Sequence, residues 1–595
     1  MPHNTLNITN CEREPVRIVG KIQRYGFLIA ADSQTGLVKY ASLNINVFLP
    51  LDSMALLGKP LNSLDSYIGF PGRISSFDFC KKSFAENVDF ARASKVDIAG
   101  QPFHLVISQI EELLVLEFQP AVQTPEITPG VFNVASKILA SKTLEGLYNN
   151  AADEIKNLID YDRVMVYKFL PDGSGLVVGE AINKNMEPFM GQSYPESDIT
   201  RQAVELYKSN RMRLIADVGG ETVDVVGQSG SRPFDMSYCS LLAASPLHIL
   251  YCENMGFGSS FSISIIIDDE LWGLITCYNT KAKHIDYRVR QGVMFLGTVI
   301  STAIVNKIDE AGKKLEIDFQ KEVSQLQHHL SFHESLLAGL TKSDTSLKNV
   351  TNADGVAVIY QNEIFLVGST PEKDQVKDLA KWARNVLADH IFLTDELSKH
   401  YSQAESFSDK ASGILVTSLG NENRDLIIWF KPEKVKNILW AEQPKKAQIE
   451  TETAGVGLRT IPGAPFKVWR ETISKTSAEW LNEELFAAQK TTQIIRDFAF
   501  RKAEEQIAID KMLKEAYEEL DRFTNSVSHD LKNPLGVIKT YAQFLVHSNV
   551  VTDEKGKDIV NKIVSSSDKI TDILQSLLEL SKISRQEKSA LQQKL

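Results

Sequence analysis

Residues 245–265 read SPLHILYCENMGFGSSFSISI, and the second half of this stretch gives the clearest indication of the secondary structure of the surrounding domain. Its end, continued to Asp268 as FSISIIID, is a run of apolar and β-branched residues that predicts a strand. The segment 163–169 (RVMVYKF) has the same character, whereas 144–160 has the spacing of a helix. We therefore expect residues 131–305 to form a mixed helix and sheet domain that ends in a helix.

Further mixed domains are expected on both sides of this one. Residues 1–125 alternate short apolar runs with turn residues, and 122–130 (VQTPEITPG) is typical of a linker because it has two prolines and no apolar periodicity. Residues 345–480 contain strand-like segments at 355–360, 363–368 and 425–430. Within this block, 443–465 is polar and contains glycine and proline, which predicts a long protruding hairpin or loop.

Helical periodicity dominates the rest of the chain. From 286 to 339 the apolar residues recur at helical spacing without a proline, over a length that predicts a helix joining two domains or pairing with its own copy. Near the C-terminus, the heptad spacing of Leu513 and Leu520 and an amphipathic stretch at 555–583 predict a helical hairpin with a turn at 549–553. Alone, such a hairpin leaves its apolar face uncovered, so we expect a dimeric four-helix bundle.

The predicted fold is therefore α+β, in four parts: 1–125, 131–305, 306–505 and 506–595.

The composition restricts the partners of this protein. A net charge of −11 without a block of basic residues argues against nucleic acid or an anionic membrane as a partner. The longest apolar stretch, 261–267, is far shorter than the ~20 residues of a membrane span, and the N-terminus lacks a signal-peptide pattern. Five cysteines without paired spacing argue against a disulfide framework or a zinc site. We expect a cytoplasmic protein.

The segment 528–535 (SHDLKNPL) is the clearest local motif. Asp530 can accept a hydrogen bond from Nδ1–H of His529 and leave Nε2 free to attack a phosphorus atom, with Asn533 one turn further on the same face. Pro534 predicts a kink in the helix. The alternative is a solvent-exposed His–Asp pair beside that kink. No Gly-rich nucleotide-binding segment follows, so any ATP-binding half is expected outside this chain.

Taken one at a time, the other candidate residues have ordinary structural interpretations. Asp198, near the start of an amphipathic helix, is typical of a helix cap. A lone histidine such as His248 is more often a satisfied core residue than a ligand, and Cys11 looks like an inert thiol on a tail. From composition and spacing alone, the chain is a multidomain sensor of an unknown ligand.

In combination, these segments resemble the bacterial phytochromes, which are red-light receptors with PAS, GAF and PHY domains followed by a histidine kinase. The resemblance covers essentially the whole chain and depends on six ordered motifs: NCEREP (10–15), YPESDI (194–199), the stretch 245–265, LWGLI (271–275), ADGVAVIY (353–360) and SHDLKNPL (528–535). It implies a "tongue" hairpin at about 440–475 in the third domain. It also implies a knot, in which the chain near Ile22 threads a loop at 220–236.

The resemblance implies a bilin site in the second domain. Cys11 would form a thioether with a vinyl group of biliverdin, because Leu247 occupies the position of the cysteine that plant and cyanobacterial relatives use. His248 and the main-chain carbonyl of Asp198 would hold the pyrrole nitrogens, and Arg213 would pair with a propionate. The remaining predicted cofactor-binding residues are Tyr167, Tyr194, Ile199, Ser245, Tyr251, Ser260, Ser262 and Tyr278. Light would turn one ring of the bilin, and the change would reach His529 of a homodimer that serves a response regulator.

Several positions depart from the family pattern. Gly463 and Pro465 replace the Arg and Ser of the tongue motif, Thr200 replaces a proline, and Tyr278 stands where a second pocket histidine is usual. Leu242 occupies the place of a second propionate-binding arginine. We therefore expect retained bilin binding with an altered photocycle. The alternative is a bilin-inert or ligand-binding module that acts as a phosphotransfer or phosphatase scaffold.

Overall fold

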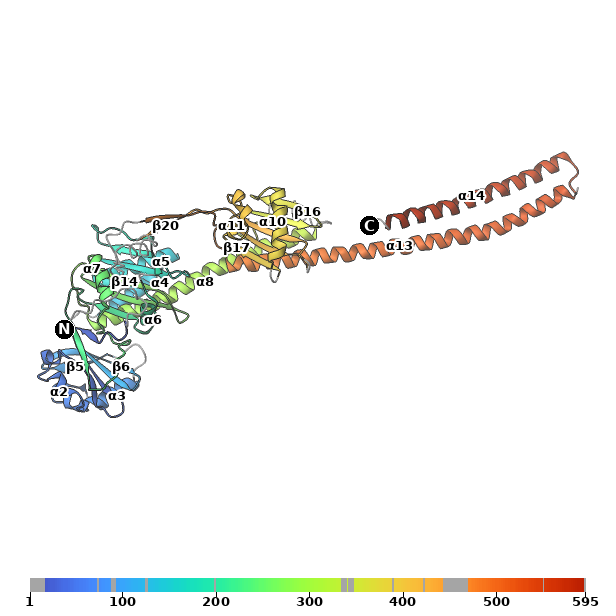
Figure 1. Ribbon diagram of the computed structural model, residues 1–595. Helices are drawn as coiled ribbons and strands as arrows, with labels where there is room; N and C mark the ends of the chain where they lie inside the picture. Colours follow the sequence, from blue (N-terminus) through green and yellow to red (C-terminus); the bar gives the residue numbers. More distant parts are fainter. Residues whose placement is uncertain are drawn as a thin grey trace. The chain divides into compact units, whose positions relative to one another are not determined.

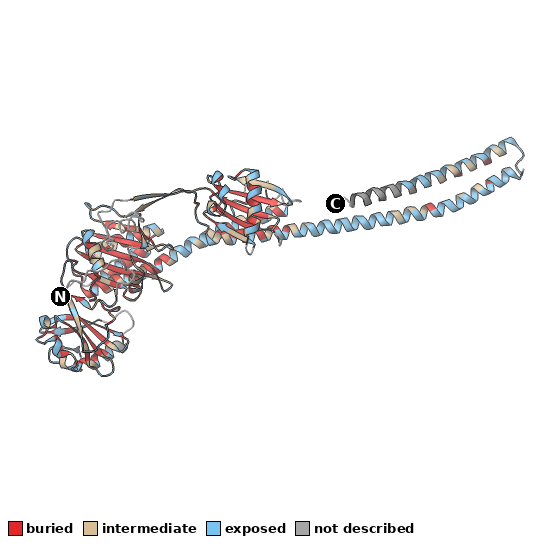
Figure 2. Cartoon of the chain, in the orientation of Figure 1, coloured by how far each residue is buried: buried red, intermediate tan, exposed pale blue. Residues whose placement is uncertain are grey.

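The computed structural model describes residues 16–71, 74–86, 93–122, 127–196, 199–332, 340, 347–387, 390–420, 423–441, 469–548 and 550–592 (Figure 1). It divides into two compact units, and each is described by itself. The first comprises Met1–Gln320, Leu393–Ile414 and Phe430–Glu483, and the second comprises Lys321–Phe392, Leu415–Trp429 and Glu484–Leu595. Buried residues concentrate around the sheets and are sparse along the C-terminal helices (Figure 2). The mixed α+β class expected from the sequence is confirmed.

The first sheet has eight strands in the order β1-β12-β3-β2-β7-β6-β5-β4. Its core includes a stacked pair, Phe27 and Phe118, whose ring centroids are 4.5 Å apart. Short helices, among them α3 (Ser76–Glu86), accompany this sheet. The strands are β1 (Lys21–Gln23), β2 (Phe27–Asp32), β3 (Val38–Ser42), β4 (Ile68–Gly69), β5 (Ala93–Ile98), β6 (Gln101–Ile110), β7 (Leu113–Pro120) and β12 (Thr222–Gly227).

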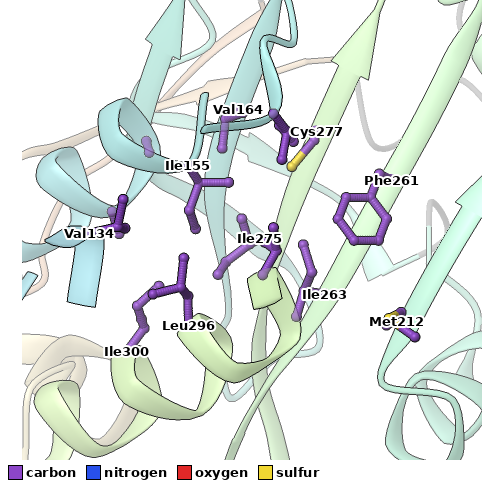
Figure 3. Close-up of a cluster of buried hydrophobic side chains, with 14 of the residues drawn as sticks. Val134, Ile155, Val164, Met212, Phe261, Ile263, Ile275, Cys277, Leu296 and Ile300 are labelled. Carbon is purple, nitrogen blue, oxygen red and sulfur yellow. The ribbon is translucent and has the colours of Figure 1, made fainter. Parts of the chain in front are cut away.

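The second sheet also has eight strands, in the order β11-β13-β14-β8-β9-β10-β20-β21. One face packs on α4 (Thr128–Leu139), α5 (Leu144–Ile159) and the start of α8 (Tyr287–Ser331), and Figure 3 shows part of this core. The strands are β8 (Arg163–Phe169), β9 (Gly175–Ile182), β10 (Gln192–Tyr194), β11 (Met212–Ile215), β13 (Ser259–Ile267), β14 (Glu270–Asn279), β20 (Lys436–Trp440) and β21 (Trp469–Ile473).

Strand β12 belongs to the second domain by sequence but pairs in the first sheet. It lies between β3 and β1, and Ile22 of β1 pairs with Val223. On its other side, Ile22 bridges to Leu242. The segment around Ile22 thus lies between two parts of the second domain. The predicted knot depends on the path of residues before Val16, which lie outside the described residues, so it stays a prediction.

The third sheet has five strands in the order β16-β15-β19-β18-β17. Its β15 (Gly355–Tyr360), β16 (Glu363–Gly368) and β19 (Leu426–Lys431) confirm the three strands predicted there, and β17 (Ile391–Thr394) and β18 (Gly413–Ser418) complete it. In the second unit, the Trp429 indole N–H donates to the Leu347 carbonyl at 3.0 Å, and helix α10 (Lys373–Val386) begins with a capping box at Glu372.

Three long helices follow the predicted periodicity. Helix α8 is the one helix in the described part of the chain that is long and apolar enough to cross a membrane, but its apolar residues from Val293 to Ile304 belong to the core of the second domain. Helix α13 (Asn482–His547) runs through Pro534, and α14 (Glu554–Gln592) follows the predicted turn. Lys539 of α13 pairs with Asp568 of α14 at 2.5 Å. The dimeric bundle stays a prediction.

Truncation of one buried side chain tests the described core of the second domain. Ile275 is fully buried and faces Ile263 in the neighbouring strand. We expect Ile275→Ala to lower the free energy of unfolding by roughly 2–5 kcal/mol, because it leaves a cavity in a close-packed core. Urea denaturation followed by circular dichroism measures the change. The control is Leu139→Ala, at a side chain that is 57% exposed. Equal effects of the two substitutions on the free energy of unfolding would contradict the burial of Ile275 in this core.

Candidate functional site

The second face of the second sheet borders a cavity. Successive side chains of a strand point to opposite faces, so Val164 and Val166 of β8 enter the core while Met165 and Tyr167 point the other way. The same alternation places Arg213 of β11, Ser262 of β13, and Leu274, Thr276 and Tyr278 of β14 on the cavity side. The other lining residues are Val16, Tyr194, Ile199, Ala203, Tyr207, Ser245, His248 and Tyr251.

Two helices close this cavity. Helix α7 (Pro246–Asn254) starts at a serine cap: the Ser245 hydroxyl oxygen accepts from the His248 backbone N–H at 3.4 Å, and Pro246 occupies the first turn. Helix α6 (Arg201–Ser209) is capped by Thr200, whose hydroxyl accepts from the Ala203 N–H. The threonine that replaces the usual proline thus has a local role as a cap.

Aromatic rings form much of the wall. The rings of Tyr167 and Tyr194 lie 5.8 Å apart between centroids, and Phe257 stacks on Tyr278 at 4.1 Å. Gly175 is required where Tyr167 crosses it, since a Cβ atom there would lie 1.9 Å from that ring. Flat walls of this kind suit a flat, conjugated ligand.

The cavity holds one cation for which the described residues supply no anion. Desolvation lowers the pKa of Arg213, and the interaction that opposes this shift comes from Tyr207, not from a carboxylate. The Arg213 guanidinium carbon lies 5.9 Å from the centre of the Tyr207 ring. A desolvated cation without a described counter-ion is costly, so this position favours a ligand that carries a carboxylate or another anion.

Two other titratable groups of the cavity, His248 and Tyr278, are neutral at pH 7. Desolvation, assisted by the positive charge of Arg213, lowers the pKa of His248 to about 4. Burial raises the pKa of Tyr278 well above its usual value, so this side chain stays a phenol that can donate a hydrogen bond. The cavity therefore offers neutral donors and acceptors beside a single guanidinium.

The structure brings together nine of the predicted cofactor-binding residues as lining of one cavity. They are Tyr167, Tyr194, Ile199, Arg213, Ser245, His248, Tyr251, Ser262 and Tyr278. Ser260 is buried on the same strand face but does not line the cavity. Cys11 and Asp198 lie outside the described residues, as do Gly463 and Pro465 of the predicted tongue. Leu242, at the position of the missing arginine, is packed in an apolar cluster.

Sequence reasoning missed several lining residues, namely Val16, Met165, Ala203, Tyr207, Leu274 and Thr276. Strand alternation could have found three of them. Met165 precedes Tyr167 by two residues, and Leu274 and Thr276 precede Tyr278 by four and two, so each shares a face with a predicted residue. Val16, Ala203 and Tyr207 had no such signal, because their positions depend on how separate segments pack.

A hairpin from the third domain adds two strands to this sheet. Residues 443–465, predicted as a hairpin or loop, lie outside the described residues, but the flanking β20 and β21 pair antiparallel. Strand β20 runs parallel to β10, and the Ala441 N–H donates to the Ser193 carbonyl at 2.9 Å. Ala441 is fully buried in the same apolar cluster as Tyr194 and Tyr278. The base of the hairpin is thus in contact with the wall of the cavity.

The predicted phosphoacceptor residues lie together on α13. His529 and Asp530 have side chains that are each 75% exposed, and Nδ1 of His529 lies 3.4 Å from an Asp530 carboxylate oxygen. Asn533 is also exposed on this helix. With three quarters of its side chain exposed, the ring of His529 is accessible from solvent.

Four known protein families match successive segments of the chain. Residues 11–121 match the PAS fold, and 143–304 match the GAF domain. Residues 320–504 match the phytochrome region, and 519–586 match the phosphoacceptor domain of histidine kinases.

Known proteins resemble the chain over most of its length. Cyanobacterial phytochrome A from Nostoc sp. is 30% identical, over 91% of this chain and 71% of its own length. A bacteriophytochrome from Pseudomonas aeruginosa is 28% identical, over 97% and 76% respectively. Among solved structures, a bacteriophytochrome from R. palustris superposes with a TM-score of 0.73 at 27% identity, covering 83% of this chain and all of that one. The photosensory core of a Stigmatella aurantiaca phytochrome gives 0.70 at 27% identity, covering 83% and 99%.

The environment of His248 makes a prediction about its titration. In the pigment-free protein, NMR of ring-labelled histidine should show His248 becoming charged only near pH 4, against about 6.5 in the unfolded chain. Arg213→Gln should raise this pKa, because it removes a nearby positive charge. Since the unfolded chain binds the proton first, this histidine makes the protein less stable as pH falls from 6.5 to 4. A midpoint near 6.5, unmoved by Arg213→Gln, would contradict the described environment.

Proposed function

The chain belongs to the phytochrome family and is a light receptor coupled to histidine-kinase signalling; from this premise we propose that it is a red/far-red receptor that binds biliverdin covalently through Cys11. The observation that carries the proposal is the cavity on the second sheet, with aromatic walls, a guanidinium without a described counter-ion and a neutral histidine. A tetrapyrrole with propionate side chains has the matching chemistry. We place this receptor in the cytoplasm.

Each group of the cavity has a proposed part in holding the pigment. The sulfur of Cys11 would add to one carbon of a vinyl C=C bond while a proton adds to the other, Arg213 would pair with a propionate, and the hydroxyls of Ser245 and Ser262 would donate to the other propionate. His248 and the carbonyl of Asp198 hold the pyrrole N–H groups. Ser260, which does not line the cavity, supports its wall from the same strand face.

The remaining residues would form the surroundings of the mobile ring. When bound, biliverdin supplies light absorption and isomerisation about a double bond. Tyr167, Tyr194 and Tyr251 enclose the ring, and the phenol of Tyr278 donates a hydrogen bond to its carbonyl in place of the usual histidine. Because the cluster that contains Tyr194 and Tyr278 also contains Ala441, a shift of these rings would alter the base of the hairpin.

The photocycle of this receptor is proposed to be unusual. In this family the tongue hairpin changes between two states, one held by its Arg against the residue at Asp198 and the other by its Ser. Gly463 offers no guanidinium and Pro465 offers no hydroxyl, so each state loses a polar contact that would stabilise it. One of the states should then be weakly stabilised or revert unusually. The second candidate function, a bilin-inert scaffold, rests on these same substitutions.

The output would be phosphoryl transfer at His529. Asp530 holds Nδ1–H of the ring, which leaves Nε2 as the nucleophile, and Asn533 orients a partner group or a water molecule. The phosphoryl group then passes to a response regulator. We propose that two copies of the chain pair through the long helices and the C-terminal hairpin.

Absorption spectra test the receptor function. The protein loaded with biliverdin should show a red band that red light converts to a far-red one, and the pigment should stay attached on denaturation. Cys11→Ala should release it, whereas Cys80→Ala, at a buried thiol of the first domain, should not. A red band that light leaves unchanged would favour the bilin-inert scaffold.

Phosphoryl transfer tests the output. With ATP and a separately purified ATP-binding domain of a related sensor kinase, the chain should acquire an acid-labile, base-stable phosphate. His529→Gln should lower the incorporation at least tenfold, because it removes the nucleophilic Nε2. The control is His547→Gln, at an exposed histidine of the same helix. Loss of labelling in both variants, or in neither, would contradict the assignment of His529.

A further inference from the structure

A buried carboxylate of the first domain binds the backbone that leads into the candidate bilin site. Glu117 of β7 is fully buried, and its two oxygens accept from the Leu241 N–H at 2.6 Å and the Ser240 N–H at 2.9 Å. The Ser240 hydroxyl adds a third bond at 3.2 Å and also accepts from the Gln119 side chain at 2.6 Å. Ser240 and Leu241 stand five and four residues, respectively, before Ser245, the cap of α7.

The same backbone is held from other directions. The Asn210 side chain donates to the Cys239 carbonyl at 3.0 Å, the Gln23 N–H donates to the Leu241 carbonyl at 2.9 Å, and the Ala243 N–H donates to the Lys21 carbonyl at 3.1 Å. We call residues 239–243 the anchor segment. Each of its ends is thus fixed, and Glu117 and Gln23 of the first domain hold the residues between the ends.

One of these contacts leads to a second wall of the cavity. The Gln23 side chain donates to the Leu214 carbonyl at 2.5 Å and accepts from the Ala216 N–H at 2.9 Å. Leu214 follows Arg213, which also influences the pKa of His248. The anchor segment therefore connects by hydrogen bonds to the strand that carries Arg213 and by covalent chain to the helix that carries His248.

We infer that Glu117 is a positioning residue for the candidate bilin site: through the anchor segment, it fixes the start of α7 with Ser245 and His248 relative to Arg213. This inference rests on the proposed function only for the identity of the ligand. A role in stability alone would leave the geometry of the cavity unchanged, whereas a positioning role predicts a change in the environment of His248.

The charge on Glu117 makes the contact sensitive to pH. Desolvation raises the pKa of Glu117 to about 7, although its three hydrogen bonds and the positive charge of Arg290 lower it. Arg290 of α8 donates to the Gln119 side chain, and the phenol of Tyr25 and the thiol of Cys239 are the other titratable groups that interact with Glu117. Protonation turns one carboxyl oxygen into a donor, so the anchor segment loses an acceptor as pH falls through 7.

The first experiment uses pigment-free protein, so that it does not depend on the proposed ligand. In Glu117→Gln, an amide nitrogen replaces one of the two accepting oxygens, and we expect roughly tenfold faster hydrogen exchange at the Ser240 or Leu241 amide. The titration midpoint of His248 should also move. Glu112→Gln, at an exposed glutamate next to the same strand, should change neither quantity. A folded Glu117→Gln protein with unchanged exchange and an unchanged His248 midpoint would overturn the inference.

The second experiment adds biliverdin. In the wild type, the absorption band should have a pH-dependent component with a midpoint near 7, and Glu117→Gln should lose it. If Glu117→Gln does not fold, Ser240→Ala, which removes one of the three bonds, should shift the same component. A component that Glu117→Gln leaves in place, or that Ser240→Ala leaves at an unchanged midpoint, would overturn the inference. If biliverdin does not bind to the wild type, the proposed function fails, and the pigment-free measurements still decide whether Glu117 positions the site.

Discussion

The alternation of side chains along β8, β11, β13 and β14 is the constraint on which the rest of the receptor depends. A strand that sends Val164 into the core sends Met165 to the opposite face, so the same few strands supply a tight apolar core and a polar, aromatic cavity. The core is covered by helices on one side (Figure 3). The other face is therefore free to carry residues such as Arg213 and Ser262, which a two-sided core would exclude.

The polar groups of the cavity gain their properties from that burial. In water, Arg213 and His248 would each be solvated and ordinary, but next to the sheet they are a cation without a described counter-ion and a neutral imidazole. Such groups reduce stability in the absence of a ligand, which is typical of a site that a ligand completes. The aromatic rings connect that site to the base of the hairpin, because the cluster that contains Tyr194 also contains Ala441.

Local patterns in the sequence were enough to predict the long helices and several strands, since periods of 2 and 3.6 depend on neighbouring residues only. Pairing between distant segments left no such pattern: β12 joins the first sheet and β20 the second. The site residues came from the resemblance, because His248 taken alone is an ordinary core histidine. Glu117 was missed for a physical reason. Within LLVLEFQP it has the pattern of an exposed residue, and it becomes buried only because another domain covers that face of the strand.

The stability of the C-terminal helical hairpin likewise depends on what covers its apolar side chains. Leu520 and Phe523 of α13 are 59% and 66% exposed, and Ile573 of α14 is 60% exposed, so the two helices leave large apolar side chains in water. An antiparallel pair alone buries too little apolar area to be stable, whereas a second copy would convert these stripes into the interior of a bundle. His529 is exposed on the same helix. In such a bundle, a change in how two copies pack would alter access to the proposed phosphoacceptor without any change in its own chemistry.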